Sequence, residues 1–125
     1  MSIVAAEIET ERAAVVTKAV LRAAEALGLT ARRLAQVIGT SEPTVSRMRA
    51  GGYQLDPASK AYELSVLLIR VFRSLDAIAG GDAVVVRQWL CQDNSALGGK
   101  PIDRLASIAG LMDVLAYLDA RRALV

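Results

Sequence analysis

The sequence predicts an all-α protein. Hydrophobic residues make up 54% of its 125 residues, whereas aromatic residues make up only 4%, a composition that suits closely packed helices. Apolar residues recur at helical spacing in successive segments, and glycines separate these segments. The length is that of one compact domain, or of two small units that share a core.

The first predicted helix runs from about Thr10 to Leu27. Val16, Val20 and Ala24 fall on one face of it, and Gly28 ends it. Residues 1–8 precede this stripe and are expected to fray.

Residues 30–51 predict a helix, a tight turn and a second helix. Thr30 is a suitable N-cap, Gly39 supplies the left-handed residue at the turn, and Ser41 or Thr40 can cap the second helix. The inward-facing positions are Leu34, Ala35, Ile38, Val45 and Met48. This is the anatomy of a helix-turn-helix, whose second helix enters the DNA major groove. The same pattern also suits an αα-hairpin that packs without meeting DNA.

The distribution of charge favours the DNA-binding interpretation. Residues 30–60 carry five bases and two acids, whereas residues 1–29 carry three bases and four acids, and residues 61–125 carry seven of each. Such a local basic patch is expected of a phosphate-binding surface. Arg47 is the first choice for base readout, because a guanidinium can bond a guanine edge bidentately. The expected DNA-binding residues are Arg32, Arg33, Ser41, Glu42, Thr44, Arg47 and Arg49, among which Arg32, Arg33 and Arg49 are phosphate anchors.

The next predicted helix begins with Asp56 as N-cap and Pro57 at its first position, and it runs to about Ala79. It is apolar over most of its circumference, so it is either covered by its own neighbours or forms a homodimer through an outer face. We favour the homodimer, because helix-turn-helix proteins usually bind two half-sites.

Beyond it we expect a helix over 83–92 that Asp82 caps and in which Val84, Val85, Trp89 and Leu90 are available for packing. A loop over 93–100, a short helix over 102–106, and a last helix over 108–122 capped by Ser107 follow. Three regions follow: residues 1–55, a central helix within 56–80, and residues 81–125.

Several classes of function are not expected. The chain has no histidine, so it lacks the usual general base at neutral pH and the commonest metal ligand. The lone Cys91 is expected to be a small buried hydrophobe, and it fits a reducing cytoplasm. The longest apolar run, Val66 to Ile69, is far shorter than the roughly 20 residues that span a bilayer. No signal peptide is evident. We therefore expect a cytoplasmic protein without enzyme activity, cofactor, metal or membrane partner.

A set of residues in the C-terminal third carries a family resemblance. The set is Trp89-Leu90, Asn94, the string Leu97-Gly98-Gly99-Lys100-Pro101, Leu105 and Gly110. It resembles the toxin-binding domain of Xre/MbcA/ParS-type antitoxins, and with the helix-turn-helix the match covers most of residues 30–118. The resemblance implies an N-terminal Xre-like helix-turn-helix bundle followed by a small C-terminal helical toxin-binding domain. Family members often place a glycine soon after the final helix, whereas this chain ends Arg-Arg-Ala-Leu-Val.

The resemblance also implies a function. Its partner would be a RES-domain toxin that consumes NAD+ or transfers ADP-ribose, and the C-terminal region would block that toxin. The helix-turn-helix would repress the shared operon by binding palindromic or pseudo-palindromic operator DNA as a homodimer. The residues implied in toxin binding are Asn94, Leu97, Gly98, Gly99, Lys100, Arg104, Arg121, Arg122 and Val125. The alternative is a dimeric helix-turn-helix repressor with no toxin partner, and a third hypothesis is an interaction protein whose helix-turn-helix does not bind DNA.

Overall fold

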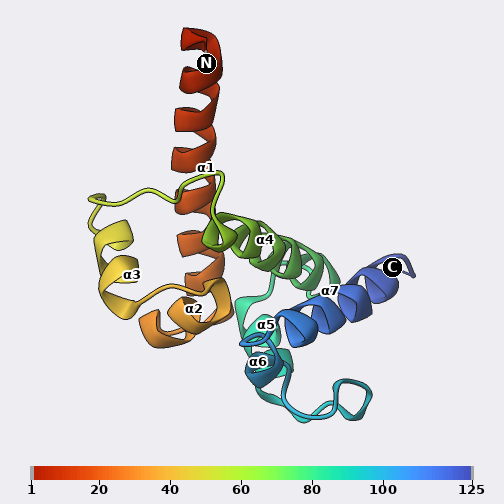
Figure 1. Cartoon of the computed structure of the whole chain (residues 1–125). Coiled ribbons are helices and arrows are strands. Elements are labelled where there is room, and N and C mark those ends of the chain that lie inside the picture. The colour runs from red at the N-terminus through yellow and green to blue at the C-terminus, as the bar shows by residue number, and fades with distance from the viewer. Residues whose placement is uncertain (1, 125) are drawn as a thin grey trace.

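The computed structural model describes residues 2–124, which form seven α-helices and one short 3-10 helix (Figure 1). In chain order they are α1 (Ile3–Leu27), α2 (Ala31–Ile38), α3 (Glu42–Arg49), α4 (Lys60–Ile78), α5 (Ala83–Cys91), η1 (Ser95–Leu97), α6 (Pro101–Arg104) and α7 (Ile108–Arg122). No strand occurs within residues 2–124, so the predicted all-α class is confirmed. None of these helices is long and apolar enough to cross a membrane.

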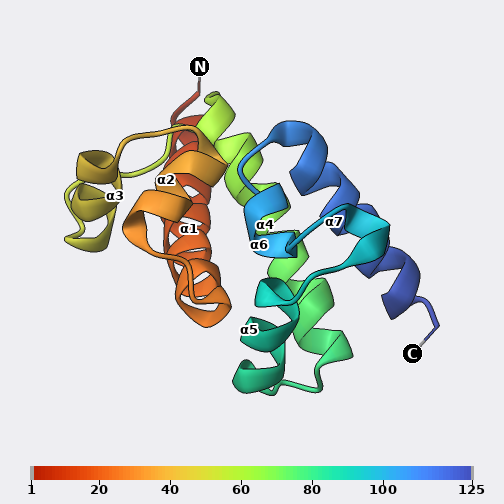
Figure 2. The same cartoon turned by 90° about the horizontal axis from the view of Figure 1, so that it is seen from below.

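Helix α4 lies at the centre of the molecule, with α1 packed on one side of it and α7 on the other (Figures 1 and 2). Leu68, Val71 and Leu75 of α4 are buried in the core between these helices. The Ser74 hydroxyl donates a hydrogen bond of 2.7 Å to Asp119 of α7. Among the large apolar side chains of α4, Val66 stays exposed. Neighbours within the chain therefore cover most of the apolar surface of this helix. A homodimer remains a prediction, but this surface does not require one.

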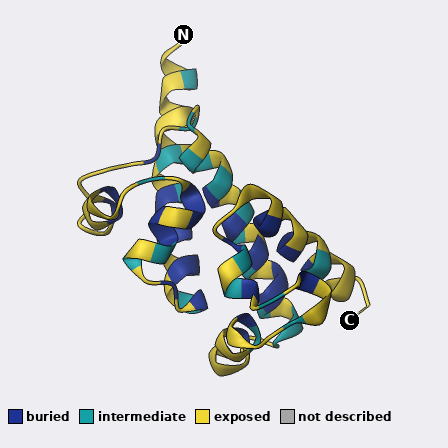
Figure 3. Ribbon diagram, turned by 60° about the horizontal axis from the view of Figure 1, so that its bottom comes forward, coloured by how far each residue is buried: buried dark blue, intermediate teal, exposed yellow. Residues whose placement is uncertain are grey.

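Helix α1 begins earlier than the sequence predicts. The Ser2 hydroxyl accepts a hydrogen bond from the Ala5 backbone N–H at 3.1 Å, and the helix is continuous from Ile3. The expectation that residues 1–8 fray is therefore wrong for residues 2–8. The Ser2 cap fixes where the helix begins, whereas the prediction placed its beginning near the first core residues. The first half of α1 projects beyond the rest of the molecule and is largely exposed (Figure 3).

The segment between α3 and α4 also differs from the prediction. Asp56 accepts a hydrogen bond from the Ala58 N–H at 2.9 Å, and this contact closes a turn rather than capping a helix. The N-cap of α4 is Ser59, whose hydroxyl accepts from the Tyr62 N–H at 3.2 Å. The buried Thr17 hydroxyl of α1 accepts from the Leu55 N–H at 2.9 Å, which fixes the path of this segment.

The C-terminal elements follow the predicted order with three corrections. Asp82 and Ser107 cap α5 and α7 as expected. The short helix α6 begins at Pro101 itself and ends at Arg104. The loop over 93–100 contains the η1 turn. The third correction concerns α5, whose buried side is formed by Val86 and Leu90.

Because α5 buries Val86 and Leu90, the other side of the helix faces solvent. Cys91 is therefore exposed rather than buried. Val84 and Val85 are exposed as well and do not pack as predicted.

Candidate functional site

Helix α3 presents a polar outer face. The Ser41 hydroxyl caps the helix by accepting from the Thr44 N–H at 3.2 Å, and Pro43 occupies the first turn. Val45 and Met48 are buried against the rest of the helix-turn-helix, as predicted. The exposed residues of α3 are Glu42, Pro43, Ser46, Arg47 and Arg49. Ser46 shares this face, although sequence reasoning passed over it.

A short chain of hydrogen bonds holds Arg47 in place. Its guanidinium donates to the Thr44 hydroxyl at 3.1 Å, and that hydroxyl lies 2.9 Å from the Ser41 hydroxyl. Thr44 is 9% exposed, so its side chain lies beneath Arg47 rather than on the outer face. The geometry makes Thr44 a support for Arg47, whereas Arg47 and Ser41 remain accessible from outside.

The two arginines at the start of α2 differ in their surroundings. Thr30 caps this helix by accepting from the Arg33 N–H at 3.1 Å, as predicted, and Arg32 is exposed. The Arg33 guanidinium forms an ion pair of 3.1 Å with Asp103 of α6. Arg33 therefore connects the helix-turn-helix to the C-terminal part of the chain, and a phosphate would compete with a carboxylate for it.

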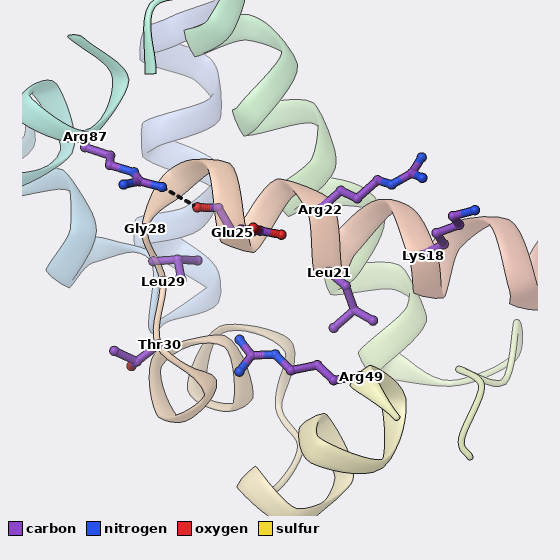
Figure 4. Close-up of a pocket in the computed structure, with 9 residues that line it drawn as sticks. All are labelled: Lys18, Leu21, Arg22, Glu25, Gly28, Leu29, Thr30, Arg49 and Arg87. Atoms are coloured by element: carbon purple, nitrogen blue, oxygen red, sulfur yellow. Dashed lines mark hydrogen bonds between the residues drawn. The ribbon is translucent and has the colours of Figure 1, made fainter. Parts of the chain in front are cut away.

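Arg49 lies in a basic groove that the sequence did not predict (Figure 4). The groove has a volume of about 630 Å³ and runs between α1, the start of α2 and the end of α3. Its other cationic side chains are Lys18, Arg22 and Arg87, and its one acidic lining residue is Glu25. The charge count by segment did not reveal this cluster. In that count the negative charges of α1 at residues 7, 9 and 11 cancel the positive charges of Lys18 and Arg22.

Arg87 has a structural role at the edge of this groove. Its guanidinium donates to the backbone carbonyls of Glu25 at 2.9 Å and Ala26 at 3.3 Å, at the C-terminal end of α1. Unpaired carbonyls at a helix end favour a cation. This contact connects α1 to the C-terminal elements, because Arg87 belongs to α5.

The loop that carries the family pattern is a closed turn. Asn94 accepts hydrogen bonds from the Ala96 and Leu97 N–H groups, and its backbone pairs with Gly99 in both directions. Gly98 has a φ of 74°, a left-handed conformation that glycine adopts without strain. Leu97 is buried in the core, whereas Gly98 and Lys100 are exposed. Asn94 and Leu97 therefore hold the turn in place, and its tip is free to meet a partner.

The remaining predicted toxin-binding residues lie along α6 and α7. Arg104 forms an ion pair of 2.9 Å with Asp113, and Arg121 lies 4.9 Å above the Tyr117 ring. Tyr117 in turn stacks on Trp89 of α5 with ring centroids 6.0 Å apart. Arg122 is exposed, and Val125 lies outside the described residues.

Two apolar pairs in the C-terminal part are also exposed. Val84 and Val85 lie at the start of α5, and Ile108 and Met112 lie one turn apart on α7. Ile108 is 65% exposed and Met112 is 45% exposed. Sequence reasoning did not single out the second pair. Exposed apolar side chains beside polar ones are a feature of protein-binding surfaces.

These elements define a helix-turn-helix protein whose C-terminal part is a set of further helices, α5 to α7, packed on the central α4. The family model for the antitoxin Xre-like helix-turn-helix domain matches residues 6–70. The model for the antitoxin Xre/MbcA/ParS C-terminal toxin-binding domain matches residues 74–123. The chain therefore belongs to the Xre-type antitoxins and is an antitoxin of a toxin–antitoxin system. These families are antitoxins and regulators rather than enzymes. No curated protein matches the chain.

Proposed function

We propose that this antitoxin represses its own operon through α3 and blocks a RES-domain toxin that consumes NAD+ or transfers ADP-ribose. The observation that carries the DNA-binding part is the support of Arg47 by Thr44 on an exposed helix. Preorganising a guanidinium reduces the conformational entropy that is lost when it bonds a base. In this proposal, Arg47 reads a base edge, while Ser41, Ser46 and Glu42 surround it.

The basic groove supplies phosphate contacts in this proposal. Lys18, Arg22 and Arg49 line it beside the N-terminus of α2, where the helix dipole also favours an anion. Such contacts strengthen binding to any DNA sequence and weaken as salt rises.

Substitutions at Arg47 and Arg22 separate base readout from phosphate binding. We expect Arg47→Ala to weaken the free energy of binding to promoter DNA by about 1–3 kcal/mol and to weaken binding to random DNA less. The variant should also lose its preference for one base at a single base pair of the promoter. Arg22→Ala should weaken binding to promoter DNA and to random DNA equally. It should also reduce by about 1 the steepness with which log affinity falls with log salt concentration, here called the salt slope. Fluorescence anisotropy at several salt concentrations measures both effects. Equal losses for Arg47→Ala on the two DNAs would make Arg47 a phosphate contact.

In the toxin-binding part of the proposal, the tip of the closed turn and the end of α7 meet the toxin. The tip offers Gly98 and Lys100, and α7 ends in Arg121 and Arg122. Two arginines suit a cleft that normally holds an anionic dinucleotide. Ile108 and Met112 add apolar area on the same helix.

The direct test measures NAD+ consumption by the protein encoded beside this gene, with and without an equimolar amount of the antitoxin. Suppressed turnover is expected. A neighbour that does not consume NAD+, or whose turnover is unchanged by the antitoxin, overturns the RES assignment.

Charge reversal at both arginines, Arg121→Glu with Arg122→Glu, should weaken this suppression and leave DNA binding intact. The matched control is Arg12→Glu with Arg73→Glu, which reverses two exposed arginines outside the proposed surface. If the control weakens suppression as much as the double variant, the end of α7 has no special role.

A further inference from the structure

Arg121, near the end of α7, rests on a pair of stacked aromatic rings. Its guanidinium carbon lies 4.9 Å from the centre of the Tyr117 ring. That ring stacks on Trp89 of α5, with ring centroids 6.0 Å apart and ring planes inclined by 27°. Both aromatic side chains are partly buried and pack against the hydrophobic core, whereas Arg121 is exposed. The rings therefore connect an exposed guanidinium to the core.

The contact with the ring leaves the N–H groups of Arg121 available. A guanidinium is planar, and an aromatic ring attracts it through its face, so its N–H donors stay in the plane and point away from the ring. The ion pairs within residues 2–124 involve other basic side chains, among them Arg33, Arg70 and Arg104. Arg121 is therefore held in place without using the donors that bind a partner.

Arg122 has the same charge and lacks this support. Tyr117 and Arg121 are four residues apart and share a face of the helix, whereas Arg122 lies about 100° further around it. The cation–π contact of Arg121 has no counterpart at Arg122 in the described part of the chain. A side chain without such support loses more conformational entropy when a partner fixes it.

We propose that Tyr117 and Trp89 hold Arg121 as a preorganised anchor that pairs with a carboxylate of the toxin. The inference rests on the toxin-binding part of the proposed function. It assigns the contact to Arg121 rather than to Arg122, and it makes Tyr117 a positioning residue that acts through Arg121. A carboxylate is the expected acceptor, because two parallel N–H groups of a guanidinium match its two oxygens.

The position of the rings favours a protein as the partner rather than DNA. Tryptophan, tyrosine and arginine are the residue types that contribute most to binding energy at protein interfaces, and all three meet here. The η1 turn of the closed loop packs against α7, so the proposed toxin-binding loop adjoins the helix that carries Arg121. Helix α3 and the C-terminal end of α7 lie on opposite sides of the molecule (Figures 1 and 2).

The first experiment measures the affinity of antitoxin variants for the purified protein encoded beside this gene, by titration calorimetry. Arg121→Ala should weaken binding by about tenfold or more, because it removes one partner of a charge pair. Arg122→Ala is the matched control and should weaken it by less than about twofold. Arg121→Lys keeps the charge but lacks the planar fork, so it should weaken binding by about fivefold or more.

The second experiment tests whether Tyr117 acts through Arg121. Tyr117→Leu should weaken binding about fivefold in the unsubstituted chain and by less than about twofold in the Arg121→Ala variant. Tyr117→Phe keeps the ring and should bind within about twofold of the unsubstituted antitoxin. Urea unfolding of each variant separates these effects from a loss of stability, since a merely structural role would weaken binding equally in both backgrounds.

The contact is also measurable in the free antitoxin. A side chain over an aromatic ring experiences the ring current, so the NMR signals of the Arg121 side-chain protons should lie upfield of those of Arg122. Tyr117→Leu should remove this difference, whereas Tyr117→Phe should keep it.

Four outcomes overturn the inference while leaving toxin binding itself intact. They are equal weakening by Arg121→Ala and Arg122→Ala, full affinity of Arg121→Lys, an equal effect of Tyr117→Leu in the two backgrounds, and Arg121 signals that match those of Arg122. Failure of the unsubstituted antitoxin to bind the neighbouring protein is a different result, because it overturns the toxin-binding part of the proposed function and this inference with it. Binding to a neighbour that does not consume NAD+ overturns the RES assignment alone.

Discussion

Gly110 of α7 lies directly against the backbone of Arg104, the last residue of α6, and Gly110→Ala tests how rigid that contact is. A methyl group at this position would lie 2.8 Å from the Arg104 carbonyl carbon and 2.9 Å from the Ser107 hydroxyl oxygen. The Arg104 carbonyl oxygen would be closer still. Because these neighbours include backbone atoms, no side-chain rotation relieves the clash, and α6 must move away from α7.

The expected cost follows from two opposing effects. Overpacking costs about 1–3 kcal/mol, and a clash with backbone belongs at the upper end of that range. Alanine is favoured over glycine inside a helix by about 1 kcal/mol, which offsets part of the cost. We expect Gly110→Ala to lower the free energy of unfolding by about 2 kcal/mol. For a chain of this length, that corresponds to a fall in Tm of roughly 8 °C.

Urea unfolding followed by far-UV circular dichroism measures this difference, and two variants calibrate it. Gly52→Ala should change stability by less than about 0.5 kcal/mol, because its methyl group would lie 3.8 Å from the nearest atom, the Arg47 carbonyl oxygen. Ala109→Gly, at the exposed neighbouring position, measures the propensity effect alone and should cost about 1 kcal/mol. If Gly110→Ala is as stable as the unsubstituted protein, the close approach of α6 to α7 is not a constraint and this reasoning fails.

Two further predictions concern polar contacts between distant segments. Asp103→Asn should release Arg33, raise DNA affinity roughly threefold and steepen the salt slope by about 0.9, as measured by anisotropy. Asp113→Asn is the control, because Asp113 has the same 61% side-chain exposure but pairs with Arg104; equal effects would show that net charge alone is responsible. Thr17→Val leaves the Leu55 N–H without its acceptor and should cost about 1–3 kcal/mol in urea unfolding. Thr10→Val makes the same change at an exposed position of α1 and should cost less than about 1 kcal/mol, so similar costs would contradict a role for burial.

Contacts between close neighbours in the chain could be predicted from the sequence. The caps at Thr30 and Ser41 and the left-handed Gly39 depend on bonds between residues three or four positions apart, and the structure shows all three. The core positions Leu34, Ala35 and Ile38 of α2 and Val45 and Met48 of α3 could also be predicted, because helical periodicity assigns them to one face. The family pattern at residues 89–110 was likewise visible before the fold was known.

Periodicity alone does not reveal which exposed side chains meet across the molecule. Lys18 and Arg22 join Arg49 in one groove only because α1 packs beside the end of α3. Arg33 meets Asp103 because α6 returns to α2 after 70 residues of chain. Such contacts depend on how the helices pack together.

The sequence by itself determined the all-α class, the helix-turn-helix and the family of this antitoxin, because these depend on spacing and local bonding. Only the tertiary structure decided that α4 is covered by its neighbours, that Cys91 is exposed and that the first half of α1 is largely exposed. The physical reason is that a helix fixes which residues share a face, whereas the packing of several helices fixes which of those faces are buried.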